Sequence, residues 1–295
     1  MVKPLKTLLV GTSVLTGLSL FAGAPALAAD LTGASVAGDH LTYLVNGSSE
    51  TVISPNNATN WQAALDTQGN IELGGQGGSP NVSDFNNPTV LTGDVDGLTA
   101  TLSSLTAVDW FGADGMTSYG DSDFANSWFG EATAEYGVTD AVLLPLSLTL
   151  ETLFDAFVVA QGFQRFSDPN IESVSGDQTS GLEITLAGHF DGTPQFFSFL
   201  TAAQQAAVSG LLGGAPFQVS EVVKVDYNSE TYFAYGFDAT QSGVVSKDDN
   251  TSHTGNYVLD RKYVPSESVP EPATALSLLA VGGLFAASKH KAGAT

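Results

Sequence analysis

The sequence predicts a mainly β fold, similar to a sandwich of antiparallel sheets, with one or two helices packed on a face or at an end. Three observations predict it. Polar and apolar residues alternate in several short segments, turn-forming residues separate these segments, and only two segments have the apolar spacing of a longer helix. Alternation places the apolar side chains on one face of a strand, so paired strands bury that face in a common core.

Two pairs of segments are typical of β-hairpins. Residues 41–45 and 50–53 flank Asn46-Gly47, a dipeptide that favours tight hairpin turns. Residues 217–227 and 231–238 are rich in Val, Phe and Tyr and are joined by three polar residues. Alternation predicts further strands at residues 98–105, 182–187 and 257–263.

Two other segments indicate helices. Residues 149–163 carry apolar side chains at the i, i+3, i+4, i+7 and i+8 positions of an amphipathic helix, namely Leu150, Leu153, Phe154, Phe157 and Val158. The second segment contains Thr193-Pro194, a capping box from Thr201 to Gln204, and Gly213-Gly214 as a stop. A short helical turn is also expected at residues 60–65.

Residues 1–28 have the order of a secretory signal peptide. Lys3 and Lys6 precede an apolar stretch from Leu8 to Phe21, and small residues follow. Ala26 and Ala28 occupy the positions of a signal cleavage site, so we expect the secretion machinery to export the chain and to cut it after Ala28.

The composition limits what the exported part does. The chain has 9 Lys and Arg against 31 Asp and Glu, a net charge of −22, and no cysteine. A surface so acidic repels phosphate, which excludes nucleic-acid binding as a function. We expect residues 29–264 to form one acidic domain without disulfides, followed by a linker at 265–268.

The C-terminal tail, residues 269–295, has three parts in a fixed order. Val269, Pro270, Glu271 and Pro272 form an extended stem, because proline disfavours helix in the residue before it. An apolar segment at 273–287 would be about 22 Å long as a helix, short of a hydrocarbon core of about 30 Å. Lys289, His290 and Lys291 form a basic stop that favours the cytoplasmic side. The sequence therefore predicts a short transmembrane helix that anchors the chain transiently.

This order of parts resembles the PEP-CTERM sorting signal of exopolysaccharide-producing Gram-negative bacteria and cyanobacteria. The resemblance covers residues 269–291, and the Lys-His-Lys cluster stands where many such tails have several arginines. It implies recognition by an exosortase, a membrane protease or transpeptidase that would process the chain near residues 270–272. The body would then be released or attached at the cell envelope, at the cell surface or in the extracellular matrix.

The body has few residues typical of a hydrolase triad or a metal site. No cysteine and no Gly-x-Ser-x-Gly motif is present, and His40, His189 and His253 lie in polar segments where we expect them to be solvated. Three isolated histidines do not form a zinc motif. Calcium is the one candidate metal, at Asp94/Asp96 or Asp121/Asp123, and no cofactor is expected.

The most distinctive stretch is residues 109–136, in which aromatic and acidic residues alternate. Trp110, Tyr119 and Trp128 are candidate glycan-binding residues, unless these rings belong to the core. Carboxyl groups for glycan hydrolysis would be Asp109, Asp121, Asp123 or Glu131. We expect a non-enzymatic surface or matrix protein associated with exopolysaccharide. The alternatives are a carbohydrate-binding module and a secreted glycan hydrolase.

Overall fold

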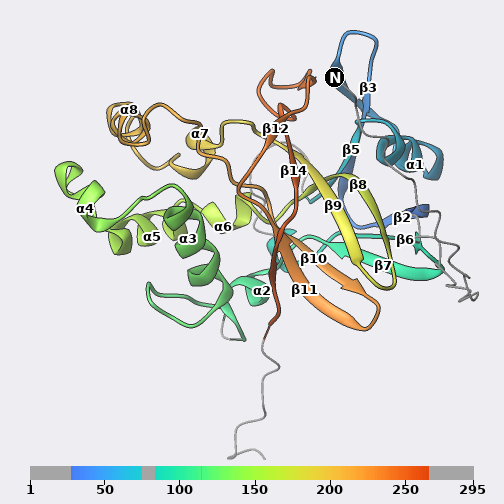
Figure 1. Ribbon diagram of the computed structural model, residues 1–295, viewed down its shortest axis with the longest axis horizontal. Helices are drawn as coiled ribbons and strands as arrows, with labels where there is room; N and C mark the ends of the chain where they lie inside the picture. Colours follow the sequence, from blue (N-terminus) through green and yellow to red (C-terminus); the bar gives the residue numbers. More distant parts are fainter. Residues whose placement is uncertain (1–27, 75–83, 114, 266–295) are drawn as a thin grey trace, which may run out of the picture.

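The computed structural model describes residues 28–74, 84–113 and 115–265. Figure 1 shows two twisted β-sheets on one side of this body and most of the helices on the other. Ala28 is exposed at the start of the described chain. Several sequence predictions lie outside the described residues: the signal peptide up to residue 27 with Ala26, the stem Val269 to Pro272, the apolar segment 273–287 and the basic stop Lys289 to Lys291.

The first sheet has nine strands among the described residues, and its order is β12-β14-β9-β8-β5-β3-β4-β13, with β1 also paired to β8. Their bounds are β1 Ala29–Asp30, β3 His40–Val45, β4 Glu50–Ser54, β5 Asn70–Leu73, β8 Asn170–Asp177, β9 Gly181–Gly188, β12 Thr240–Gln241, β13 Val245–Ser246 and β14 Gly255–Val258. The pairing is antiparallel throughout, except that β13 runs parallel to β4. The sheet is therefore mixed.

The second sheet has six antiparallel strands in the described chain, in the order β15-β11-β10-β7-β6-β2. Their bounds are β2 Thr32–Ala37, β6 Val90–Val95, β7 Leu98–Ser103, β10 Val223–Tyr227, β11 Glu230–Tyr235 and β15 Arg261–Tyr263. Both predicted hairpins are confirmed, as β3–β4 and β10–β11. The predicted strand at 257–263 is two strands, since β14 belongs to the first sheet and β15 to the second.

The two sheets share one core. Ile71, Ile171 and Ile184 of the first sheet pack with residues such as Leu102 and Val225 of the second, and all are at most 2% exposed. Helix α1 (Ala58–Asp66) lies beside β3, β5 and β8 and adds Ala64 and Leu65 to this core. One face of each sheet is used for this packing, which is why apolar residues alternate along the strands.

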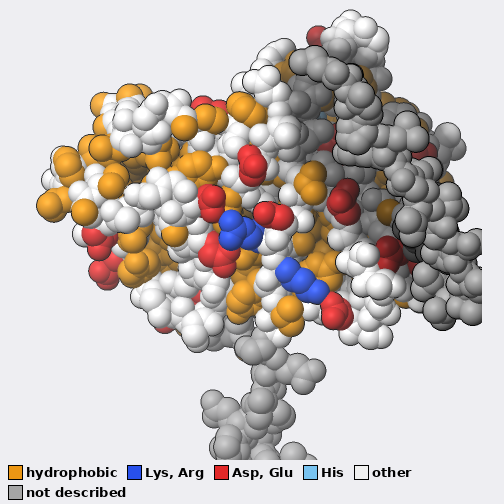
Figure 2. Space-filling view, viewed as in Figure 1, with side chains coloured by type: hydrophobic (Ala, Val, Ile, Leu, Met, Phe, Trp, Pro, Cys, Tyr) orange, Lys and Arg blue, Asp and Glu red, His pale blue; other side chains and the backbone are white. Residues whose placement is uncertain are grey.

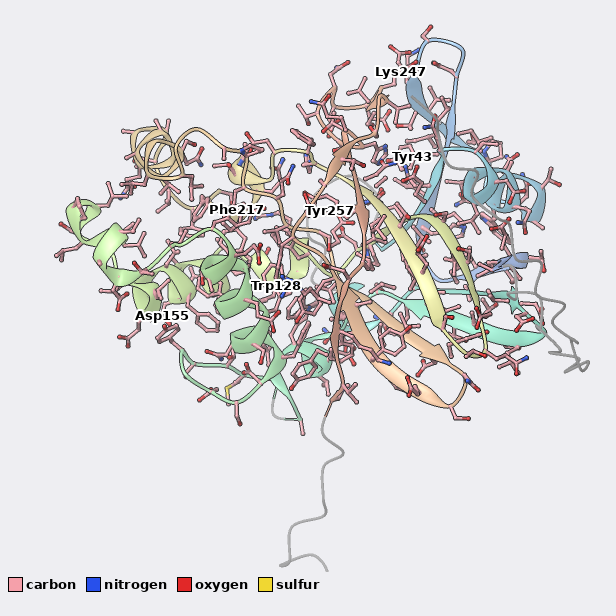
Figure 3. All side chains as sticks on the ribbon, in the orientation of Figure 1. Tyr43, Trp128, Asp155, Phe217, Lys247 and Tyr257 are labelled. Atoms are coloured by element: carbon pink, nitrogen blue, oxygen red, sulfur yellow. The ribbon has the colours of Figure 1, made fainter. Side chains whose placement is uncertain are left out.

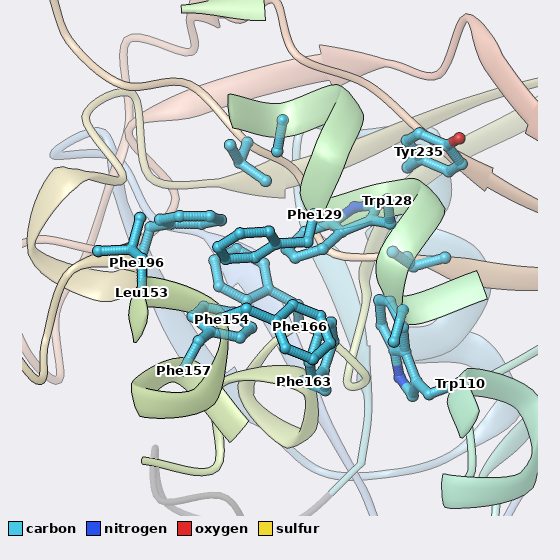
Figure 4. Packing of buried hydrophobic residues seen from close by; sticks show 14 of the residues in the cluster. Trp110, Trp128, Phe129, Leu153, Phe154, Phe157, Phe163, Phe166, Phe196 and Tyr235 are labelled. Carbon is cyan, nitrogen blue, oxygen red and sulfur yellow. The ribbon is translucent and has the colours of Figure 1, made fainter. Parts of the chain in front are cut away.

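A second core lies within the helical layer and is mainly aromatic (Figure 4). The helices of this layer are α2 Ala107–Phe111, α3 Phe124–Glu135, α4 Asp140–Leu143, α5 Leu150–Val159, α6 Gly162–Arg165, α7 Thr193–Phe196 and α8 Ala202–Leu211, with short 3-10 turns at Leu144–Leu146 and, nearby, Asp84–Asn86. The prediction of one or two helices was wrong, since eight α-helices occur in the described residues. Figure 2 shows hydrophobic side chains gathered on the surface of this layer.

The predicted helix at 149–163 is broken in two. Thr149 caps α5 through a capping box, and Leu153, Phe154 and Phe157 are buried as the spacing predicts. Gln161 adopts a left-handed conformation with φ of 58°, which ends the first helix before α6 begins. A Cβ on Gly162 would lie 2.4 Å from the Phe157 ring, so glycine allows the rings of Phe157 and Phe163 to meet. The predicted capping box of Thr201 with Gln204 is confirmed.

Each end of the described body crosses from one sheet to the other. Near the N-terminus, β1 pairs with β8 of the first sheet and β2 pairs with β6 of the second. Near the C-terminus, β14 pairs with β9 of the first sheet and β15 with β11 of the second. Strands β2 and β15 are the two edges of the second sheet.

No single helix of the described chain has the length and apolar character needed to cross a membrane. One bent pair, Asp140–Leu146 with Leu150–Val159, passes that test only when taken together, with an angle of 73° between its parts.

Candidate functional site

A cavity of about 800 Å³ opens on the face of the first sheet that points away from the second sheet. We call it the acidic cavity. The residues that characterise it are Tyr43, Glu72, Arg165, Asp168, Asn170 and Glu221. Ser246 and residues between Asp248 and His253 form one wall, and the loops that flank α6 and α7 form the other. The cavity lies where the sheet meets the helical layer.

Glu72 lies on the floor of the acidic cavity, on β5. The tripeptide Asn-Ile-Glu occurs at 70–72 and again at 170–172, and the two copies pair so that Ile71 is opposite Ile171 and Glu72 is opposite Asn170. Alternation sends both isoleucines into the core and both polar partners into the cavity. This repeated polar pattern in two buried strands is the sequence signal for the site, and it was missed.

The Glu72 carboxyl group is buried among other acidic groups. The Tyr43 hydroxyl on β3 donates a hydrogen bond to Oε2 of Glu72 over 3.3 Å. Burial, together with the negative charges of Asp168, Asp248 and Asp249, raises the pKa of Glu72 to about 8, although the Tyr43 hydrogen bond opposes this. Glu72 is therefore largely protonated at neutral pH. Burial and the Glu72 charge also raise the pKa of Tyr43.

The loop between α6 and β8 brings Asp168 to the same cavity. The Trp110 indole N–H donates to Oγ of Ser167 over 2.7 Å, and the carbonyl oxygen of Pro169 accepts from the backbone N–H of Leu73 over 2.9 Å. A Cβ on Gly74 would lie 2.5 Å from Cβ of Asp168, so glycine permits this close approach. The loop is thus fixed on both sides of Asp168.

Glu221 enters the cavity from the segment before β10. The backbone N–H of Asn170 donates to its Oε2 over 2.9 Å, and Nδ2 of Asn170 donates to the same oxygen over 3.1 Å. Burial, followed by the Asp168 charge, raises the pKa of Glu221 well above its usual range despite these bonds. The backbone N–H of Val222 donates to the carbonyl oxygen of Phe166 over 2.9 Å, which holds the two loops together.

Arg165 supplies a positive charge at the wall. Its guanidinium donates to the carbonyl oxygens of Gln195 and Ala160 over 3.2 and 2.9 Å and also to Oγ of Ser198. Burial lowers the pKa of Arg165, while the charge of Asp168 opposes that change. Arg165 and Asp168 therefore lie close enough for their charges to interact.

Two side chains that line the cavity have polar atoms without a partner. Asn170 is 8% exposed, and its Oδ1 makes no hydrogen bond to any described residue. The same is true of Oε1 of Gln195, although its Nε2 lies 3.2 Å from the ring of His189. A buried polar atom without a partner is costly, so the side chains around the cavity carry unsatisfied hydrogen-bonding capacity.

The prediction that the three histidines are solvated was wrong. His253 is 3% exposed and His40 is 8% exposed, while His189 is half-buried. Nδ1 of His253 lies 2.7 Å from Oγ1 of Thr51, and burial lowers the pKa of His253 to about 4. His189 and His253 both line the acidic cavity.

One serine in the cavity lies near a histidine, but the pair lacks the arrangement of a nucleophilic triad. Oγ of Ser252 is 3.4 Å from Nε2 of His189 and donates instead to Asp249. Burial would raise the pKa of Asp249, but hydrogen bonds from Ser252 and Thr251 lower it to about 2. The carboxylate thus binds the serine and does not orient the histidine.

The predicted glycan-binding residues do not form a surface together. Trp110 and Trp128 are both fully buried, so they belong to the core, which is the alternative that the sequence left open (Figure 4). Trp110 packs on Phe163 with ring centroids 4.9 Å apart, and Trp128 packs on Phe166 at 5.0 Å. These rings support the cavity wall from behind. Tyr119 is 43% exposed and packs its ring edge on Phe154.

The acidic residues predicted for hydrolysis have other roles. Asp109 caps α2 and forms an ion pair of 2.9 Å with Lys224, and Asp123 caps α3. Asp121 accepts a hydrogen bond from the backbone of Ser118, and Glu131 accepts one from the Tyr235 hydroxyl.

The two predicted calcium positions are also held by internal bonds. Oδ1 of Asp94 accepts from the N–H of Gly97 over 3.0 Å, and Oδ2 of Asp96 accepts from the N–H of Gln178 over 3.2 Å. Across residues 28–74, 84–113 and 115–265, no three His, Asp or Glu side chains are placed to hold a metal ion.

Comparison with known proteins found no match. No family model, no curated protein and no solved structure is similar to this chain.

Proposed function

We propose that this chain is an exported cell-surface or extracellular-matrix protein, sorted by an exosortase, whose folded body binds a saccharide of the surrounding exopolysaccharide in the acidic cavity. The signal peptide pattern and the Val269 to Pro272 stem support the placement. The observation that supports binding is a cavity of about 800 Å³ whose walls combine carboxyl groups, amides and aromatic rings. This volume is within the usual range of small-molecule sites.

The chemistry of the walls favours an uncharged, polyhydroxylated ligand. Five acidic side chains, Glu72, Asp168, Glu221, Asp248 and Asp249, outnumber the single arginine, so anionic ligands are repelled. Sugar hydroxyl groups donate to carboxylates and accept from amides and guanidinium groups. Tyr43 and Phe166 line the cavity but are 6% and 4% exposed, so they offer only small apolar contacts to a sugar.

Binding is tested with the full exported chain on a glycan array, including polysaccharide extracted from exopolysaccharide-producing bacteria. We expect selective binding that Asp248→Asn and Gln195→Ala weaken. Asp248 is exposed at the rim of the cavity and Gln195 is half-buried, so neither change disturbs the core. Asp155→Asn is the matched control, because Asp155 is exposed on α5 in the helical layer, outside the cavity (Figure 3). Uniformly flat arrays would refute saccharide binding.

Placement is tested separately by deleting residues 269–295 in a bacterium that has an exosortase. We expect the truncated chain to lose its surface location while the intact chain keeps it. Unchanged retention at the surface would refute sorting by the tail.

A further inference from the structure

We propose that the acidic cavity hydrolyses a glycosidic bond, with the Glu72 carboxyl group as general acid and the Asp168 carboxylate as general base. This inference rests on the proposed saccharide binding and goes beyond it. It departs from the non-enzymatic role that the sequence favours. The carboxyl groups in question are also different from those of residues 109–136.

Three carboxyl groups from separate segments of the chain line the acidic cavity. Glu72 comes from the sheet floor, Asp168 from the loop after α6 and Glu221 from the segment before β10, and all three line one cavity. Each lies near enough to the others for its charge to affect them. Glycoside hydrolysis needs two carboxyl groups that face one bond.

The two proposed catalytic carboxyl groups, Glu72 and Asp168, have different electrostatic surroundings. Glu72 is 9% exposed, accepts a hydrogen bond from Tyr43 and is surrounded by negative charge, which favours its protonated form. The negative charge of Asp168 is one of the causes that raise the pKa of both Glu72 and Glu221, and it also acts on Arg165. A pair of carboxyl groups whose environments favour opposite protonation states is the arrangement that acid–base hydrolysis uses.

The surrounding structure holds both Glu72 and Asp168 in fixed positions. Glu72 is on a strand between β3 and β8, and the Asp168 loop is fixed by the Trp110 bond to Ser167 and by the Leu73 bond to Pro169. Catalytic groups need such rigid positions.

The reaction consumes one water molecule and needs no other reactant. Glu72 donates its proton to the glycosidic oxygen as the bond between that oxygen and C1 breaks. The oxygen of a water molecule bonds to C1, and Asp168 takes the proton that this water loses. Return of that proton from Asp168 to Glu72 restores the starting state, and the products are two shorter saccharides.

The test uses the full exported chain with 4-methylumbelliferyl and 2,4-dinitrophenyl glycosides of the common hexoses and pentoses, and with soluble polysaccharides followed by a reducing-sugar assay. We expect turnover of at least one polysaccharide. Glu72→Gln should lower kcat on it by about 10²- to 10⁴-fold. The loss should be much smaller with the 2,4-dinitrophenyl glycoside, because that leaving group departs without a proton. Asp168→Asn should also turn over its substrate slowly. Added azide should restore its activity, because azide attacks C1 without losing a proton.

Glu172→Gln is the matched control. Glu172 is on β8, is 8% exposed and bonds to Asn256, but it does not line the cavity. It should keep wild-type turnover. The alkaline fall in the wild-type rate should lie near pH 8, as Glu72 loses its proton, and should be absent from Glu72→Gln.

Three results would overturn hydrolysis: no turnover of any glycoside or polysaccharide, an equal loss in Glu172→Gln and Glu72→Gln, or cleavage of casein in place of glycans. Selective binding on the array without turnover would overturn hydrolysis and leave the binding function intact. An absence of both would overturn both proposals.

Discussion

The Glu72→Gln variant should be more stable than the wild-type protein at neutral pH. The change replaces a buried acid by an amide of nearly the same shape that does not titrate. In the folded chain the pKa of Glu72 is about 8, compared with an ordinary value of 4.5. Between these two values the folded state holds a proton that the unfolded state has lost, so folding stability falls as pH rises.

The magnitude follows from the width of this window. One pKa unit corresponds to about 1.4 kcal/mol, so from pH 4.5 to pH 7 Glu72 costs the wild-type protein about 3 kcal/mol. This cost reaches its full value above pH 8, where Glu72 is ionised in the folded state as well. Glu72→Gln escapes this cost, and we expect its free energy of unfolding to match the wild type near pH 4.5 and to exceed it by about 3 kcal/mol at pH 7.

The assay is urea unfolding followed by tryptophan fluorescence at pH 4.5, 6, 7 and 8. Trp110 and Trp128 are buried, so their emission reports the loss of the core. Glu172→Gln gives a graded comparison, because burial raises the pKa of Glu172 only to about 6 and its advantage should be complete near that pH. If the free energy of unfolding changed with pH in the same way for wild type and Glu72→Gln from pH 4.5 to pH 8, the buried, protonated state of Glu72 would be refuted.

Three further predictions concern the core, a cap and a buried imidazole. Trp128→Ala should lower the free energy of unfolding by about 3–5 kcal/mol, because it removes the centre of the aromatic cluster; a loss below about 1 kcal/mol in urea unfolding would contradict its burial. Thr201→Ala should cost about 1 kcal/mol by removing the cap of α8, and Thr201→Ser should restore most of it in the same measurement. His253 should remain neutral down to about pH 4 in an NMR titration of its ring, and a midpoint near 6.5 would show that the ring is solvated.

The strands could be predicted because their signals are local. Leu98, Ala100 and Leu102 alternate with threonines, and β7 follows that alternation. Asn46-Gly47 lies between β3 and β4 as a hairpin dipeptide does. What alternation does not encode is which sheet a strand joins, so one apparent strand near residue 260 proved to be two in different sheets.

The site could not be predicted in the same way, because its parts come from distant segments. Glu72, Asp168 and Glu221 are brought together by the pairing of β5 with β8 and by the contact between two loops. Their chemistry results from that burial, which no local pattern reveals. The aromatic residues at 109–136 were conspicuous for a different reason: Phe124, Trp128 and Phe129 lie on one face of α3 and fill the helical core.

The crossing of both ends of the described body between the sheets bears on how long the folded body survives. Chain ends usually fray first, and proteases attack where they fray. Here the two strands at each end of the described body, β1 with β2 and β14 with β15, pair in different sheets. Unfolding from either end of the described body would break pairing first in one sheet and then in the other, and such successive contacts favour a high barrier to unfolding. This topology would give a chain without cysteine some of the kinetic stability that other exported proteins obtain from disulfide bonds.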